Sequence, residues 1–399
     1  MASQDRGHEI WPLLVDGWLA VTITRDGDAM YTMHPLRSPG RQRPAKVPAT
    51  AVLSRFAIMR KSSEGITIES PLAWCRVEVR SRALSALARA LDMGEPAGDH
   101  LEERLRQDLA WGGLLVDDPA TERDTFRLSQ WNTHDLWFHE RTRFRESSTG
   151  YGGTGWADGR FDPVPAERPQ IIGERILLHR PDLDQLRRTD LTLTAALENR
   201  TSIRAHDDDS PLKVDAVGEF LYRCARTRRK WARNGLELLS RPYPGGGSLY
   251  ELEIYPVVRY VDGLEPGLYH YDAQEHALVS IHADGEQVSR MLALAGASAG
   301  VSDQPQLLMV ITARFGRVMW KYEQLAYSLI LKDVGVLYQV MYLVATAMGL
   351  APCALGTGDS VAFAEATGID SLEESNVGEF MLGGYAPNKS GESDACGPG

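Results

Sequence analysis

The run Arg200-Thr201-Ser202-Ile203-Arg204 places two guanidinium groups and a hydroxyl close together at the end of a helix predicted over 191–199. Arginine binds phosphate through paired hydrogen bonds, and a hydroxyl adds another donor at close range. The run therefore favours a phosphate site. A solvated polar loop with ion pairs to Asp207, Asp208 and Asp209 is the alternative, and on spacing alone it is the commoner arrangement.

Two loops contain closely spaced glycines, Pro244-Gly245-Gly246-Gly247-Ser248 and Leu355-Gly356-Thr357-Gly358. Glycine lacks a Cβ and adopts positive φ, so such loops let the backbone approach a flat ring or a phosphate. Both also fit plain turns. Neither has the spacing of a dinucleotide fingerprint or of a P-loop, so those two nucleotide-binding folds have little support.

Lys321 and Tyr322 form the pair best suited to proton transfer, within Trp320-Lys321-Tyr322-Glu323 at the predicted start of a long apolar helix. A neighbouring ammonium favours the phenolate form of tyrosine, which can act as a base. Side chains that follow one another in a helix diverge, however, so capping and solvation are the default roles of these residues.

Two further clusters have plainer interpretations. The basic run from Arg223 to Arg233 surrounds Trp231 and could attract an acidic peptide or a phosphate, although a solvated helical face is the commoner meaning. His134, Asp135 and His139 have a spacing that could suit a metal, but aromatic residues interleave them and no third ligand is near. We expect packing there and no metal site.

Taken together, these motifs resemble the nitroreductase-like flavoproteins, and specifically the SagB-type azoline oxidases that act on ribosomally made peptides. The resemblance covers about Leu191 to Tyr385. It rests on the arginine–serine run, on Arg241-Pro242-Tyr243-Pro244-Gly245-Gly246, on the Gly356 turn and on the Lys321-Tyr322 pair. Gly245 stands where the family usually has serine. The first half, including 131–139, is similar to the amino-terminal extension of these oxidases.

The resemblance implies an FMN-dependent dehydrogenase that converts thiazolines or oxazolines to thiazoles or oxazoles, with dioxygen reoxidising the flavin. Lys321 and Tyr322 would be catalytic. The cofactor-binding residues would be Arg200, Thr201, Ser202, Arg204, Pro244, Gly245, Gly246, Leu355, Gly356, Thr357 and Gly358. The implied partners are an azoline-bearing precursor peptide, a cyclodehydratase and a second copy of the chain in a homodimer. An NAD(P)H-dependent nitro or quinone reductase and a flavin-free scaffold are the alternatives.

Composition supports an ordinary globular protein. The chain has 399 residues, a net charge of -11 and 43% hydrophobic residues, which argues against a general nucleic-acid binder. The four cysteines are far apart, so we expect a reducing cytoplasm and no disulfide framework. The first sixteen residues do not have the pattern of a secretory signal, and Lys332 and Asp333 interrupt the apolar stretch 325–350, which predicts a buried helix with no membrane span.

Periodicity predicts an α+β chain in which a mixed sheet is wrapped by helices. We expect an extension over 1–50, a winged-helix-like domain over 51–145, a flexible linker over 146–185 and a last domain over 186–399. The resemblance implies that the last domain binds FMN, and it makes peptide binding one candidate role of the winged-helix-like domain. In the last domain, helices are predicted over 191–199, 214–229 and 325–350, a buried strand over 307–312, and a hairpin from 268–271 and 277–281.

Overall fold

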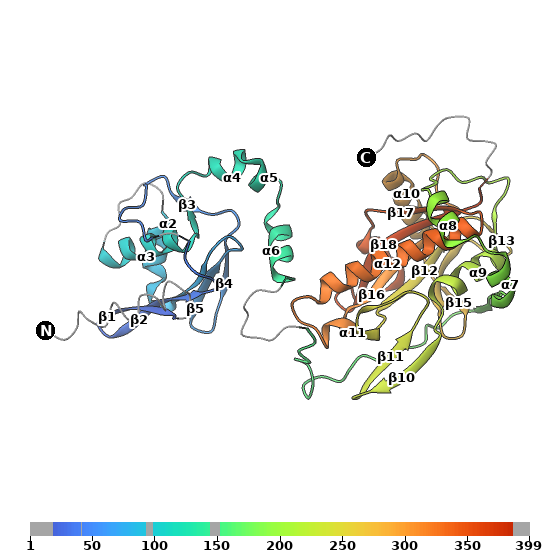
Figure 1. The fold of residues 1–399 in the computed structure, drawn as a ribbon, viewed down its shortest axis with the longest axis horizontal. Coiled ribbons are helices and arrows are strands. Elements are labelled where there is room, and N and C mark those ends of the chain that lie inside the picture. Colours follow the sequence, from blue (N-terminus) through green and yellow to red (C-terminus); the bar gives the residue numbers. More distant parts are fainter. Residues whose placement is uncertain (1–18, 41, 93–98, 144–151, 386–399) are drawn as a thin grey trace. The chain divides into compact units, whose positions relative to one another are not determined.

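The computed structural model describes residues 19–40, 42–92, 99–143 and 152–385. The chain divides into two compact units, Met1–Tyr151 and Gly152–Gly399 (Figure 1). Both combine helices with antiparallel sheet, which confirms the predicted α+β class. Three features named in the sequence analysis lie outside the described residues. They are the first sixteen residues, which were expected to carry no secretory signal, residues 146–151 of the predicted linker, and Cys396.

The first unit is built on a five-stranded antiparallel sheet. Its strands, in spatial order, are β1 (Val21–Arg25), β2 (Asp28–Pro35), β6 (Cys75–Arg80), β5 (Gly65–Glu69) and β4 (Ile58–Lys61). Helices α2 (Leu84–Leu91) and α3 (His100–Gly112) pack on it, and Tyr31, Val77 and Leu105 are fully buried in the shared core. Asp99 caps α3 in a box with Glu102, and Gly113 ends it in the left-handed region.

This sheet is larger than the winged-helix-like arrangement predicted for residues 51–145. Strands β1 and β2 come from the segment expected to be an extension, and β2 pairs with β6 so that Tyr31 lies opposite Val79. A single unit therefore includes both segments. Short elements complete it: β3 (Val52–Leu53), β7 (Leu115–Val116), α4 (Ala120–Asp124), α5 (Phe126–Ser129), α6 (Thr133–Arg141) and the 3-10 turn η1 (Ser81–Ala83).

The second unit contains a seven-stranded sheet in which all neighbouring strands are antiparallel. The order is β17 (Ala351–Leu355), β18 (Glu374–Gly383), β16 (Leu307–Arg314), β12 (Leu252–Val258), β14 (Gly267–Asp272), β15 (Ala277–Ile281) and β8 (Arg175–Leu177). The predicted apolar strand and the predicted hairpin are therefore confirmed as β16 and as β14 with β15. Every residue of β12 and β16 is buried, because helices cover both faces of the sheet.

Two helices lie on each face. On one face, α9 (Val214–Ala225) and α12 (Ala326–Ala347) pack around Ile254 of β12 (Figure 1). On the other face, α10 (Gly285–Ala299) and α13 (Ser360–Thr367) pack around Tyr255, the next residue of the strand. The remaining elements are α7 (Leu183–Thr189), α8 (Leu193–Asn199), α11 (Phe315–Met319), β9 (Leu212–Lys213), β13 (Val261–Asp262) and η2 (Gly246–Ser248).

Helix α12 is the single helix in the described ranges that is long and apolar enough to cross a membrane. It is held among other elements of the unit, in contact with α9, β12, β17 and β18. Length and composition alone are weak evidence for a span, since core helices pass the same test.

The described part of the predicted linker is attached to the second unit. The Trp156 indole donates to the Met319 carbonyl at 2.6 Å, and Arg317 Nη1 donates to the Val164 carbonyl at 2.7 Å. Residues 152–168, called the strap below, are therefore fixed to α11 and the sheet. The glycines and prolines of this segment predict a flexible connection instead.

The basic run does not form one helical face. Helix α9 ends at Ala225, and Arg229–Arg233 forms strand β10, which pairs with β11 (Leu236–Ser240). Asn234 and Gly235 make the two-residue turn with φ of 51° and 75°. Positive φ at both positions is the geometry that an Asn-Gly hairpin turn favours.

Candidate functional site

The arginine–serine run leaves α8 and joins the edge of the main sheet. The Ile203 amide donates to the Pro352 carbonyl at 2.8 Å. The Tyr342 hydroxyl of α12 lies 2.8 Å from Ser202 Oγ and accepts a hydrogen bond from the Ala354 amide at 2.8 Å. A single phenol therefore connects this run to strand β17.

The two guanidiniums of the run have no carboxylate partner among the residues that the structure describes. Arg200 lies over the Tyr342 ring at 5.3 Å, while Arg204 lines a cavity of about 320 Å³ with His206 and Arg259. Asp208 forms an ion pair with Arg259 at 2.7 Å. The alternative interpretation, in which the arginines of the run pair with the nearby aspartates, is therefore wrong for Asp208. Two unpaired cations beside a hydroxyl form a donor set suited to an anion such as a phosphate.

The turn at 356–358 continues directly from β17, with Leu355 buried at the strand end. Gly356 has open space at its Cβ position, whereas a Cβ on Gly358 would lie 2.8 Å from Glu379 Oε1. The Thr357 hydroxyl lies 2.5 Å from that of Ser298. Burial raises the pKa of Glu379 to about 7. The turn thus offers exposed backbone backed by a buried carboxyl group.

Lys321 and Tyr322 lie between α11 and α12, so they do not open the long helix as predicted. That helix begins at Ala326, and Tyr322 instead forms a β-bridge with Gly153 of the strap. The Lys321 ammonium sits 5.2 Å from the centre of the Tyr322 ring. Because Lys321 and Tyr322 lie outside the helix, their side chains need not diverge as neighbours in a helix do. The two side chains can therefore act on one substrate.

The second glycine loop packs against this pair. Gly247 has φ of +62°, and a Cβ there would lie 2.8 Å from the Tyr322 hydroxyl and 3.3 Å from Lys321 Nζ. A Cβ on Gly245 would lie 3.1 Å from the ring of Tyr250, while Pro244 is exposed. Glycine is needed at 247 for both its φ and its size.

Two buried carboxyl groups, those of Asp333 and Glu251, lie next to the glycine loop 244–248. Asp333 of α12 accepts a hydrogen bond from the Gly246 amide at 2.9 Å. Glu251 is fully buried, and its two oxygens have no hydrogen-bond partner in the described residues. Burial, followed by the Asp333 charge, raises the pKa of Glu251 to about 8, and burial also raises the pKa of Asp333. Burial therefore favours the neutral form of the Glu251 carboxyl group.

The predicted residues thus form two groups in one chain. Arg200, Ser202 and Arg204 lie near the strand that leads into Leu355–Gly358, whereas Gly245 and Gly246 lie near Lys321 and Tyr322. Thr201 is exposed beside the first group. The two groups contact α12 at Tyr342 and Asp333, which are nine residues apart and so lie about 180° apart around the helix axis.

Sequence reasoning missed Tyr342, Asp333 and Glu251 as residues of the site, and it placed Gly247 in a candidate loop without giving it a role. A polar side chain inside a long apolar helix is the signal that could have indicated the first two, because it needs a buried partner. Glu251 stands beside Leu252 at the start of an apolar strand, which is a similar signal.

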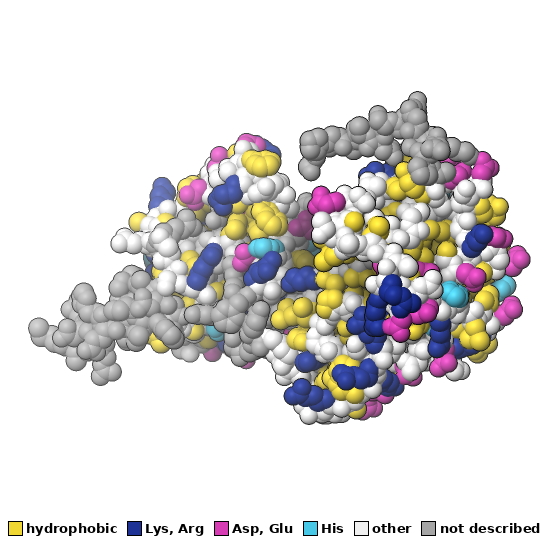
Figure 2. Space-filling model, turned by 45° about the vertical axis from the view of Figure 1, so that its right-hand side comes forward, with side chains coloured by type: hydrophobic (Ala, Val, Ile, Leu, Met, Phe, Trp, Pro, Cys, Tyr) yellow, Lys and Arg dark blue, Asp and Glu magenta, His cyan; other side chains and the backbone are white. Residues whose placement is uncertain are grey.

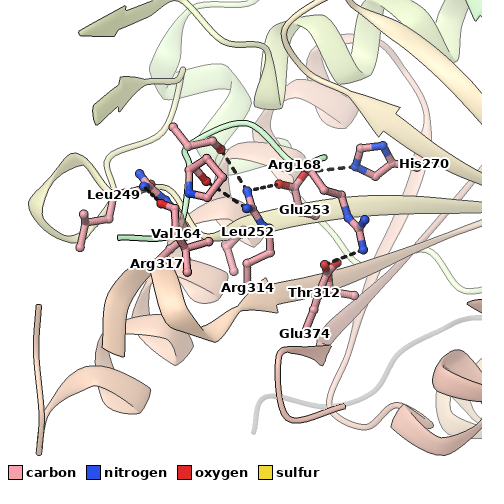
Figure 3. Close-up of polar contacts among 12 residues, drawn as sticks. Val164, Arg168, Leu249, Leu252, Glu253, His270, Thr312, Arg314, Arg317 and Glu374 are labelled. Atoms are coloured by element: carbon pink, nitrogen blue, oxygen red, sulfur yellow. Dashed lines mark hydrogen bonds and ion pairs between the residues drawn. The ribbon is translucent and has the colours of Figure 1, made fainter. Parts of the chain in front are cut away.

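A separate polar cluster fastens the strap to the sheet (Figure 3). Arg168 pairs with Glu374 at 2.9 Å, and Glu253 pairs with His270 at 3.1 Å. Arg314 donates to the carbonyls of Pro165 and Ala166. Arg168, Glu253 and His270 also line a cavity of about 670 Å³, and none of its lining residues is a predicted site residue. No group of three His, Cys, Asp or Glu suited to a metal occurs in the described residues.

Comparison with known proteins finds a family match in each of the two units. Residues 197–384 match the nitroreductase family, and residues 51–148 match the family described as cyanobactin oxidase ThcOx. A candidate nitroreductase of Methanocaldococcus jannaschii is 28% identical over 187 residues, 46% of this chain and 86% of that protein. The microcin B17-processing protein McbC of Escherichia coli is 30% identical over 115 residues, 28% of this chain and 42% of McbC.

Solved structures overlay on part of the chain. A candidate nitroreductase of Anabaena variabilis covers 62% of this chain and 45% of its own, with 25% identity and a TM-score of 0.44. The Escherichia coli microcin synthetase McbBCD complex, with truncated pro-MccB17 bound, covers 58% and 90%, with 20% identity and a TM-score of 0.39.

The second unit is therefore a nitroreductase-family domain. The match to the cyanobactin oxidase ThcOx family precedes this domain in the same chain, so the two matches lie in the order expected for the oxidases that the sequence motifs resemble. The matched part covers less than half of McbC.

We predict that Glu251→Gln changes how stability depends on pH. The raised pKa means that the folded chain binds more protons than the unfolded chain between the ordinary value of 4.5 and about 8. The free energy of unfolding of the wild type should therefore fall as the pH rises through that window. The fall should be smaller in Glu251→Gln, as measured by urea denaturation across the window.

The exposed Glu265→Gln is the matched control and should follow the wild-type curve. If the Glu251→Gln curve runs parallel to the wild-type curve, the buried carboxyl does not titrate in this window.

Proposed function

We propose that the protein is an FMN-dependent azoline oxidase that aromatises thiazoline or oxazoline rings in a ribosomally made peptide. The observation that carries this proposal is the placement of Lys321 and Tyr322 against Gly247 in a nitroreductase-family domain. The cyanobactin-oxidase module and the relative named as a microcin-processing protein support a peptide substrate.

The donor set of the first group fits FMN. Arg200 and Arg204 carry charges that no carboxylate neutralises within the described residues, and Ser202 is held between them, as binding of a phosphate and a polyol chain requires. Gly356 leaves room for a flat ring beside exposed backbone. When bound, FMN would supply the two-electron acceptor for a hydride leaving the substrate ring.

The chain's own residues would handle the proton. Aromatisation removes two hydrogens from the azoline, and the carbon next to the peptide carbonyl bears the more acidic one. Tyr322 would take that proton on its phenolate oxygen as the ring carbon–hydrogen bond breaks. Lys321, whose ammonium lies over the Tyr322 ring, would stabilise the phenolate and orient the substrate.

The position of the two groups supports a homodimer. Asp333 and Tyr342 direct them to different sides of α12, so a second copy could complete a site that one chain leaves divided. Leu193 and Leu197 of α8 are 68% and 47% exposed, and Tyr327 and Leu331 of α12 are 40% and 39% exposed. An uncovered apolar surface of this kind is typical of a subunit interface. A cyclodehydratase is the proposed additional partner, as the family resemblance implies.

Tyr322→Phe tests the catalytic assignment. Removing the base should slow azoline oxidation about 10²–10⁴-fold while FMN stays bound. The measurement is mass spectrometry of an azoline-bearing peptide, which loses two hydrogens for each ring oxidised. The exposed Tyr260→Phe is the matched control and should behave as the wild type.

Unchanged turnover in Tyr322→Phe would place the base elsewhere. Rapid bleaching of the bound flavin by NAD(P)H in a protein that leaves azolines intact would favour a reductase. A colourless purified protein would favour a scaffold.

Arg200→Ala tests the phosphate contact. Loss of a charge-assisted hydrogen bond to the cofactor costs about 1.5–3 kcal/mol, so FMN should bind about ten to a hundred times more weakly. Flavin absorbance per chain after gel filtration measures retention, with the exposed Arg187→Ala as the control. Full retention would show that other groups hold the phosphate.

The oligomeric state tests the interface. Light scattering should give about twice the 44.2 kDa of one chain. Leu193→Glu combined with Leu197→Glu should yield monomers, because buried carboxylates oppose association. Leu372→Glu alters another exposed leucine and should leave the dimer intact. A flavin-loaded wild-type monomer would contradict the proposal.

A further inference from the structure

The basic run forms a localised positive surface on an acidic protein. Residues 223–233 contain six basic side chains and no acidic one, against a net charge of -11 for the chain. Figure 2 shows Lys and Arg side chains around a hydrophobic centre at the lower end of the second unit, where Figure 1 places β10 and β11. Charge of one sign gathered on a small surface attracts the opposite charge.

Most of these cations are not neutralised within the described residues. Arg223 pairs with Asp190 and Glu219, and Lys230 pairs with Glu167 and Glu237. Four arginines have no carboxylate partner among the described side chains. Arg226 and Arg229 instead lie over aromatic rings, at 4.4 Å from Tyr222 and 4.7 Å from Trp231, and the other two are Arg228 and Arg233.

A cavity lies at the start of this surface. It has a volume of about 340 Å³ and is lined by Arg180, Arg226 and Arg228, together with five uncharged or histidine residues and no carboxylate. His276 uses one ring nitrogen toward Tyr271 and the other toward the His179 carbonyl, so it offers no free group. Three guanidiniums without a counter-charge suit the carboxylate of a ligand.

Strand β10 begins where the cavity ends. Arg228 lines the cavity, and Arg229 is the first residue of β10. The strand pairs with β11 on one side and with no other strand that the structure describes. Its other edge can therefore bond an added strand through the backbone. Arg229 and Arg233 of the strand repel a second copy of the same strand and favour a strand with acidic side chains.

The hairpin is connected to the proposed catalytic pair. Arg317 of α11 donates from one guanidinium to the carbonyls of Glu237 in β11 and Leu249, at 2.8 Å and 2.6 Å. Leu249 follows η2, the glycine turn that touches Tyr322, and α11 ends two residues before Lys321. A peptide bound along β10 would lie on an element fixed to the same backbone as the catalytic pair.

We propose that β10 and the adjoining three-arginine cavity dock an acidic, extended segment of the peptide substrate. The segment adds to the free edge of β10, and one of its carboxylates enters the cavity. This inference rests on the proposed function for the identity of the ligand as a substrate, while docking itself depends only on the charges and the free edge.

Fluorescence anisotropy of a labelled peptide with alternating Glu and Thr tests the docking on the full chain. A matched peptide with Gln in place of Glu should bind at least about tenfold more weakly, and added salt should weaken the acidic peptide. N-methylation of alternate residues should also weaken it about tenfold, since it removes the backbone donors. Equal binding of the Glu and Gln peptides would overturn the proposal.

Charge reversal locates the site. Arg228→Glu, Arg229→Glu and Arg233→Glu together should weaken the acidic peptide at least about tenfold. The control variant changes the net charge equally at three other exposed positions, Arg187→Glu, Arg188→Glu and Lys213→Glu. Its affinity for the acidic peptide should stay within about twofold of the wild-type affinity. An equal loss of peptide affinity in both triple variants would show that only the net charge attracts the peptide, and it would overturn the proposed site. If the reversal variant fails to fold, Arg→Gln at the same three positions replaces it.

Because the probe contains no azoline and the readout is binding, this outcome is independent of oxidation. Docking without ring oxidation would overturn the proposed function alone, and oxidation without docking would overturn this inference alone.

Discussion

The second unit depends on the packing of one face of α12 against the sheet and α9. This 22-residue helix packs an apolar face against α9 and the sheet, and the polar side chains on that face must find partners there. Asp333 accepts from the Gly246 amide, while the phenols of Tyr338 and Tyr342 accept from the amides of Glu379 and Ala354. An unmade hydrogen bond at such a position would cost about 1–3 kcal/mol. The helix therefore fixes a loop, strand β18 and strand β17 at the same time.

Buried charges have the same effect on the strap. Arg314 and Arg317 are 6% and 3% exposed, and both donate to carbonyls in residues 164–166. Removing a guanidinium from water is tolerated only when its donors are used, so the strap has to follow the path that offers those carbonyls. That path continues through Gly153 to Tyr322. A segment that looks like a linker is in this way part of the surroundings of the proposed base.

Charge is distributed unevenly over the second unit. The chain is acidic as a whole, yet the hairpin of β10 and β11 carries cations that lack carboxylate partners in the described residues. Cation–π contacts with Tyr222 and Trp231 keep two guanidiniums in place without neutralising them. The glycine loop, the hairpin and α11 are joined through Arg317, so the polar and the catalytic features share one support.

The sequence by itself determined the class of fold, the strand at β16, the hairpin of β14 and β15, and the residue types that suggest a phosphate site and a base, because these signals are local. It also carried the family resemblance, which the family matches confirm. The Asn234-Gly235 turn was equally local, but the basic residues around it were interpreted as a helical face.

Only the tertiary structure decided that Lys321 and Tyr322 leave the helix, that β1 and β2 complete the first sheet, and that Glu251 faces Asp333. Each of these depends on a partner distant in sequence: Gly153, β6 and α12. The free energy of a contact of that kind comes from burial and from hydrogen bonds made across the fold, so no pattern of neighbouring residues contains it.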